Sequence, residues 1–173
     1  VKGDLVNYGS VVDAASGLFY VDLYKDLQNY GVLKTTELDF KGGVVHQLSQ
    51  SINKPIESTT IHLNTGDTII LASDITILKG DIKAAPYVSW GNVKTNGYTL
   101  SLDSAFLYRL QIHGNDTVYS NSSLAHIVAF QNKVKLTGVW NFYSDVSFSD
   151  STTNFGTIQN RDGYGVTLKS NAD

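Results

Sequence analysis

Two short apolar runs that lie unusually close together constrain the fold more than any other feature of this sequence. Residues 69–71 read Ile-Ile-Leu and residues 75–77 read Ile-Thr-Ile, with only Ala-Ser-Asp between them. Both runs have the β-branched side chains that are typical of strands. Neighbouring parallel strands need a crossover of about a dozen residues. The two runs therefore form either a tight hairpin or two sides of one coil of a β-solenoid.

The chain from residue 55 to residue 173 repeats this pattern of short, closely spaced strand-like runs. Nearly every segment is a three- to seven-residue run of alternating apolar and polar side chains, bounded by turn signals such as Asn96-Gly97 and Asp162-Gly163. This pattern predicts an all-β domain at 55–173. A solenoid that resembles a parallel β-helix and a β-sandwich or jelly roll both fit it.

Residues 1–54 are expected to form a separate N-terminal segment, with a possible helix at 13–31. The apolar side chains that share one helical face there are Phe19, Leu23, Leu27 and Tyr30. A strand through Phe19, Val21 and Leu23 is the alternative.

Composition excludes several classes of function. Charged residues make up only 17% of the chain, the net charge is −3, and no run of Lys or Arg occurs, so a nucleic-acid partner is not expected. The absence of Cys removes disulfides, thiolate metal sites and cysteine nucleophiles. No apolar run approaches the roughly 20 residues of a membrane span, so membrane insertion is not expected. Because the chain lacks Met and begins at Val1, we expect it to be a processed chain or a piece of a longer protein.

Several segments resemble coils of the right-handed parallel β-helix, the pectin-lyase-like fold. They are GDTIILASDITI, NGYTLSLDS, LQIHGN and AHIVAFQN, which combine short strands with Asn, Asp or Gly at their ends. Stacked Asn side chains can form ladders along such coils. A Cys-free, β-rich composition full of Ser, Thr, Asn and Gly is also similar to that of bacteriophage tail spikes and tail fibres. That resemblance implies an intertwined homotrimer at the virion surface or outside the cell.

Motifs for chemistry are scarce. The sequence has no phosphate-binding glycine loop and no Gly-x-Ser-x-Gly nucleophile elbow. Its histidines, His46, His62, His113 and His126, never pair at a spacing typical of metal ligands, so each is interpreted as a structural strand residue. No cofactor and no metal are expected. An irregular Ca²⁺ site among loop Asp and Asn residues is the one alternative.

Paired carboxylates are the enzymatic option. Asp145 and Asp150 lie near aromatic residues, and two acids at a fixed distance are what glycan cleavage requires. They are candidate catalytic residues of a polysaccharide depolymerase. The competing interpretation is that these aspartates only end strands and begin turns.

Aromatic side chains are the stronger clue to function. Tyr87, Trp90 and Tyr143 are candidate ligand-binding residues, because Tyr and Trp offer flat amphipathic surfaces that stack on sugars or anchor proteins. The alternative is that Trp90 and Trp140 belong to the core or to a subunit interface.

These observations predict a structural and receptor-binding module of a trimeric surface fibre, an adhesin for a cell-surface glycan or receptor. Binding rather than catalysis is the expected activity. A polysaccharide depolymerase of the same architecture and a monomeric carbohydrate-binding β-sandwich are the alternatives.

Overall fold

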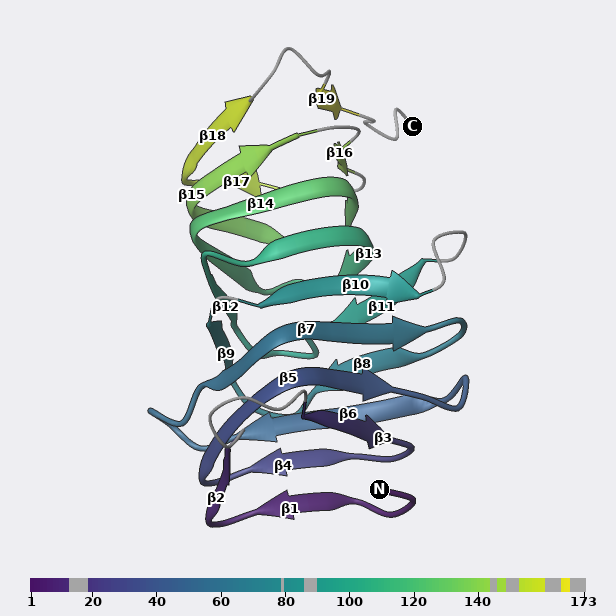
Figure 1. Cartoon of the computed structure of the whole chain (residues 1–173). Coiled ribbons are helices and arrows are strands. Elements are labelled where there is room, and N and C mark those ends of the chain that lie inside the picture. Colours follow the sequence, from purple (N-terminus) through teal and green to yellow (C-terminus); the bar gives the residue numbers. More distant parts are fainter. Residues whose placement is uncertain are drawn as a thin grey trace.

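The protein is a parallel β-solenoid, as seen in the computed structural model (Figure 1). The structure describes residues 1–12, 19–78, 80–85, 90–143, 146–148, 153–160 and 166–168. These residues form nineteen strands, which pair in parallel and stack coil upon coil from the N-terminus to the C-terminus. They contain no helix, and therefore no helix that could cross a membrane. The all-β, parallel β-helix-like prediction is confirmed, and the sandwich alternative is wrong.

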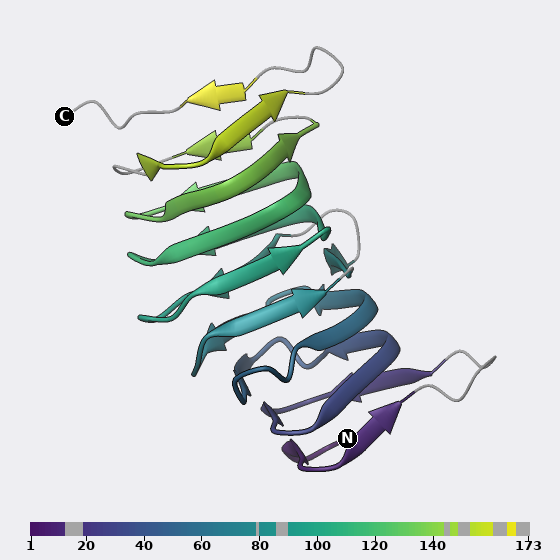
Figure 2. The same ribbon diagram turned by 90° about the vertical axis from the view of Figure 1, so that its left-hand side faces the viewer.

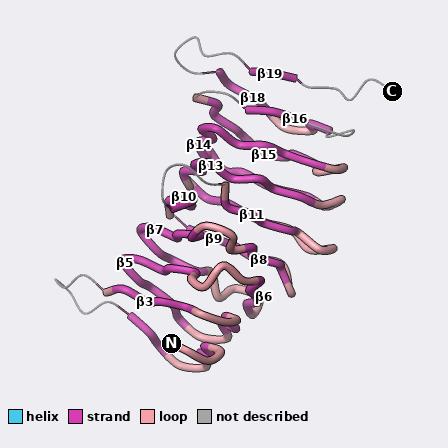
Figure 3. Tube along the Cα trace, turned by 90° about the vertical axis from the view of Figure 1, so that its right-hand side faces the viewer, coloured by secondary structure: helices cyan, strands magenta, loops and turns pink. Residues whose placement is uncertain are grey.

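Each coil has three sides, and the strands on each side pair into a continuous wall (Figures 2 and 3). Wall A is formed by β1 (Leu5–Asn7), β4 (Leu27–Asn29), β6 (Val45–Gln50), β8 (Thr68–Leu71), β11 (Gly91–Lys94), β16 (Val146–Phe148), β19 (Val166–Leu168) and the last residues of β13 (Phe106–His113) and β14 (Thr117–Gln131).

Walls B and C share several strands that bend around a corner. Wall B contains β3 (Tyr20–Leu23), β10 (Asp81–Ala85), the first half of β13, the middle of β14 and the last residues of β5 (Val32–Phe40), β7 (Ile56–Asn64), β15 (Lys135–Phe142) and β18 (Thr157–Asn160). Wall C contains β2 (Ser10–Val12), β9 (Ile75–Leu78), β12 (Leu100–Asp103), β17 (Thr153–Asn154) and the first residues of β5, β7, β14 and β15.

The core is a column of apolar side chains inside the three walls. Successive strand residues point to opposite faces, so every second residue faces inward. On wall A, for example, Ile69, Val93, Ile112 and Phe130 occupy one ladder and are all buried. Burial of each such side chain contributes about 1.5–3 kcal/mol, which makes this interior the main source of stability.

Coil length differs between the two halves of the stack. In the lower half, Asp26 and Gln47 are hydrogen-bonded across a coil of 21 residues, and Asp74 and Thr99 across a coil of 25. Above β11 most paired positions are closer in sequence: Asp103 of β12 and its hydrogen-bonded neighbour on β14 are 18 residues apart. This shorter period was not recognised in the sequence.

The helix expected at 13–31 is wrong for the described part of that range, where the chain forms β3 and β4. Residues 13–18 lie outside the described residues. Leu23 and Leu27 are both buried because they face the core from two strands on either side of a turn, rather than from successive turns of one helix. The strand alternative holds for Val21 and Leu23, whereas Phe19 is exposed.

Strands from both sides of the expected boundary at residues 54 and 55 belong to one stack. β5, from the expected N-terminal segment, pairs along most of its length with β7 beyond Pro55. An asparagine ladder occurs within the first coils: Asn7 Nδ2 donates to Asn29 Oδ1 at 2.9 Å, and both side chains are buried. The ladder type was expected from the resemblance, although at different positions.

Candidate functional site

The outer face of wall B carries the most unusual group of side chains among the described residues. Glu37 and Asp39 on β5 alternate with Leu38 and Phe40, which are buried in the core. The same alternation on β7 turns His62 outward and its apolar neighbours inward. The strand pattern alone therefore fixes the direction of each polar side chain.

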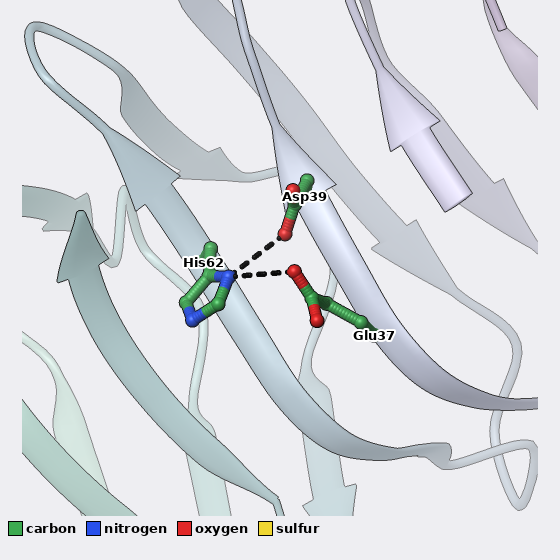
Figure 4. A group of neighbouring side chains, drawn as sticks. All are labelled: Glu37, Asp39 and His62. Atoms are coloured by element: carbon green, nitrogen blue, oxygen red, sulfur yellow. Dashed lines mark hydrogen bonds and ion pairs between the residues drawn. The ribbon is translucent and has the colours of Figure 1, made fainter. Parts of the chain in front are cut away.

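Register brings three of these side chains together (Figure 4). Asp39 and His62 are directly paired across β5 and β7, and Glu37 lies two residues away on the same face. His62 Nδ1 lies 2.9 Å from Asp39 Oδ1 and 3.0 Å from Glu37 Oε1. All three side chains are half-buried, so their polar atoms are held by strands yet remain open to solvent. We call these three residues the acid–histidine cluster.

Lys41 lies beside the cluster and contacts two carboxylates. Its Nζ lies 2.7 Å from Asp22 Oδ1 and 3.3 Å from Asp39 Oδ2. The hydrogen bond to Asp22 is the main cause that raises the pKa of Lys41; burial acts against the rise, and Asp39 adds to it. Lys41 therefore holds the second oxygen of Asp39 and leaves Oδ1 directed at His62.

Aromatic side chains follow the cluster on the same wall. The pairing continues from His62 to Lys83, Tyr108 and His126 in successive coils. The rings of Phe106 and Tyr108 are nearly parallel, with an interplanar angle of 15° and centroids 6.2 Å apart. Lys83 Nζ lies 6.0 Å from the Phe106 centroid, within cation–π range.

This face is a continuous strip of charged and then aromatic side chains. Strands in a wall are spaced by about 4.8 Å, so the four steps from Asp39 to His126 span roughly 19 Å. Carboxylates accept hydrogen bonds from hydroxyl groups, and aromatic rings stack on apolar faces. The strip therefore offers both kinds of contact that an extended, hydroxyl-rich polymer requires.

The residues expected from the sequence are only partly described. Trp90 is 37% exposed and directly precedes β11, whereas half-buried Tyr143 follows β15 and donates its backbone N–H to Ala125 O at 3.0 Å. The two lie on different coils. Trp140 is fully buried, in agreement with its interpretation as a core residue. The candidates that lie outside the described residues are Tyr87, Asp145 and Asp150.

The acid–histidine cluster was missed because its members are about one coil apart in sequence. Asp39 precedes His62 by 23 residues and Glu37 precedes it by 25. Searches for local spacing cannot find such a group. The coil length of this region, applied to the outward positions of β5 and β7, would have paired them.

Comparisons of the chain with family models, curated proteins and solved structures find no match.

Proposed function

We propose that this chain is a receptor-binding module of a surface fibre, an adhesin that binds a cell-surface glycan along the outer face of wall B. The observation that carries the proposal is the continuous strip formed by the acid–histidine cluster and the Phe106–Tyr108 ring pair. Rigid neighbouring strands hold these groups in place before a ligand arrives, which reduces the entropy lost on binding.

The charges on the strip favour a neutral, hydroxyl-rich glycan. Its four carboxylates outnumber its three cations, one of which is Arg109, 5.6 Å from the Tyr108 ring centroid, so a strongly acidic polymer would meet net repulsion. Carboxylates and the imidazole can instead hydrogen-bond to sugar hydroxyls, while Phe106 and Tyr108 cover the apolar face of a ring. The charged side chains concerned are Asp22, Glu37, Asp39, Asp81, Lys41, Lys83 and Arg109.

Assembly into a homotrimer, located outside the cell or on a virion, is part of the proposal. Three copies of a weak site act together when the ligand repeats along a surface. The first two coils support assembly because they expose several large aromatic side chains: Tyr8, Tyr20, Tyr24 and Tyr30. Light scattering after size exclusion should give three times the chain mass, and a monomer would remove trimerisation from the proposal.

Glycan arrays of bacterial surface polysaccharides, followed by calorimetry on each hit, test the binding proposal. Tyr108→Ala should weaken binding at least about tenfold, equivalent to about 1.4 kcal/mol, because it removes a stacking surface. The matched control is Tyr119→Ala, which removes an exposed tyrosine from wall C. Trp90→Ala tests the other aromatic candidate. Binding that is lost with Trp90→Ala and kept with Tyr108→Ala would place the site away from wall B.

A polysaccharide depolymerase is the second candidate, and the paired carboxylates of the acid–histidine cluster favour it. The three ligand-type atoms of the cluster lie within 4.8 Å of one another. The two carboxylates are therefore at least as close as the roughly 5–5.5 Å between the carboxyl groups of retaining glycosidases. Release of reducing ends from a bound polysaccharide, abolished by Glu37→Gln or Asp39→Asn, would support catalysis. Binding without release would leave the chain an adhesin.

A further inference from the structure

The acid–histidine cluster has the composition of a cation site as well as that of a sugar-binding site. One histidine nitrogen and two carboxylate oxygens, from three side chains on two adjacent strands, converge within 4.8 Å (Figure 4). A single ring nitrogen faces both oxygens, at 2.9 and 3.0 Å. One N–H hydrogen cannot point fully at two acceptors, whereas a metal ion accepts all three atoms as ligands.

The net charge around the cluster is negative enough to balance a divalent cation. Asp22, Glu37 and Asp39 contribute three formal negative charges, and Lys41, which contacts Asp22 and Asp39, offsets one of them. The lysine of the next coil is paired with an aspartate of its own strand, β10, at 2.6 Å. If His62 acts as a neutral ligand, the three carboxylates and Lys41 together give an excess of two negative charges around the cluster.

We propose that Glu37, Asp39 and His62 bind a divalent cation of the zinc class, with Nδ1 of His62 and one oxygen of each carboxylate as ligands. A nitrogen ligand suits Zn²⁺ and related transition metals, whereas Ca²⁺ and Mg²⁺ prefer all-oxygen sets. Three protein ligands leave at least one position open for water or a sugar hydroxyl. This inference does not depend on glycan binding, although a bound ion on wall B would add a Lewis-acidic contact to that surface.

The walls supply the rigidity that such a site needs. Glu37 and Asp39 flank buried Leu38, and His62 lies between two buried residues of β7. These core side chains fix the backbone, so few side-chain torsions remain to be ordered when an ion binds.

Isothermal titration of the chain with Zn²⁺, after treatment with a chelator, tests the proposal. We expect one ion per chain, with an affinity at least about tenfold weaker in Glu37→Gln, Asp39→Asn and His62→Gln. The matched controls are Glu57→Gln and His113→Gln, which change the same residue types outside the cluster and should bind Zn²⁺ like the wild type. Circular dichroism establishes that each variant keeps its β-structure.

Direct evidence comes from the imidazole nitrogen resonances. Zn²⁺ should shift Nδ1 of His62 and leave His113 unchanged. Absence of saturable Zn²⁺ binding up to about millimolar concentration would overturn the proposal, since ligand sets of this kind bind more tightly. Equal affinity in the cluster variants and the controls would also overturn it, as would saturable Ca²⁺ binding without Zn²⁺ binding. Glycan affinity measured with and without the chelator reports separately on the adhesin proposal.

Discussion

The lower coils, through β11, and the upper coils, from β12 onward, form one stack but bury different side chains. The lower coils contain a buried ionisable pair, His46 and Asp67. His46 pairs with Ile69, the first residue of the apolar ladder on wall A. Coil length differs as well, from between 21 and 25 residues in the lower coils to 18 residues for most pairs of the upper ones. The upper coils bury a group of aromatic rings: Phe130, Trp140, Phe142 and Phe148.

Side chains form hydrogen bonds from one coil to the next in both halves. In the lower half, Asp67 Oδ1 accepts the backbone N–H of Val44 at 2.9 Å, and an aspartate that precedes β4 accepts one from β6 in the same way. In the upper half, β12 and the start of β14 pair without a register shift, and residues with positive φ stack at their corner, as Ser104 does below Ser122. Both halves therefore use polar side chains between coils, such as Asp26 below and Asn121 above, whereas the acid–histidine cluster occurs in the variable lower coils.

The largest expected effect tests the aromatic core of the upper coils. Phe130→Ala removes a ring that lies edge-on to Trp140 at 5.4 Å and stacks on Phe148 at 5.5 Å. The free energy of unfolding should fall by about 4 kcal/mol, through lost transfer energy and a cavity. Urea denaturation measures the change. Tyr119→Ala, in the same strand but exposed, should change it by less than about 0.5 kcal/mol.

The buried pair of the lower coils is expected to have the next largest effect. His46 Nδ1 lies 2.9 Å from Lys25 O, and Nε2 lies 3.3 Å from Asp67 Oδ1. His46→Leu leaves Asp67 buried without this partner and should cost about 3 kcal/mol in urea denaturation. Combining it with Asp67→Asn should recover part of the loss, because the amide oxygen still accepts from Val44. An equal effect of Asp67→Asn in the wild type and in His46→Leu would show that the two side chains are not coupled.

His113, on β13, is expected to make the stability of the protein sensitive to acid. Burial, followed by the charge of Lys94, lowers the pKa of His113 below its ordinary value of 6.5. As pH falls through 6.5, the unfolded chain takes up this proton before the folded chain does, so the free energy of unfolding decreases. His113→Gln should therefore lose less thermal stability than the wild type between about pH 7.5 and 5.5. Identical pH profiles would assign the acid sensitivity to other groups.

The smallest expected effect tests the corners of the upper coils. Ser122 has a φ of 58° and is exposed, and Asn tolerates this left-handed region better than Ser does. Ser122→Asn should raise the free energy of unfolding by about 0.5 kcal/mol, as measured by thermal denaturation. The same change at Ser101, within β12, should give no gain. A loss at Ser122 would mean that its hydroxyl contributes more than backbone strain costs.

Much of the fold followed from the sequence, because strand alternation is a local signal. The runs at 69–71 and 75–77 are indeed two sides of one coil, β8 on wall A and β9 on wall C. The helix expected at 13–31 failed because two buried leucines four residues apart fit both a helical face and a turn between strands. The coil period escaped notice because its length changes halfway along the chain.

Less of the candidate site could be predicted. Aromatic residues were expected to form a platform, but Phe106 and Tyr108 stand out only once the walls are assembled. His62 was interpreted as a structural residue because neither carboxylate partner is near it in sequence. In a solenoid, contacts are set by coil length, which local motifs do not encode.

The regular spacing of the upper coils makes that half extensible. A duplicated segment as long as the separation of Val128 in β14 and Val146 in β16 would preserve the alternation of inward and outward side chains on wall A. Each such insertion should lengthen the particle by about 4.8 Å without altering β5 or β7. The number of upper coils therefore determines the distance between the C-terminal end of the stack and the acid–histidine cluster. That distance can be changed in steps of one coil.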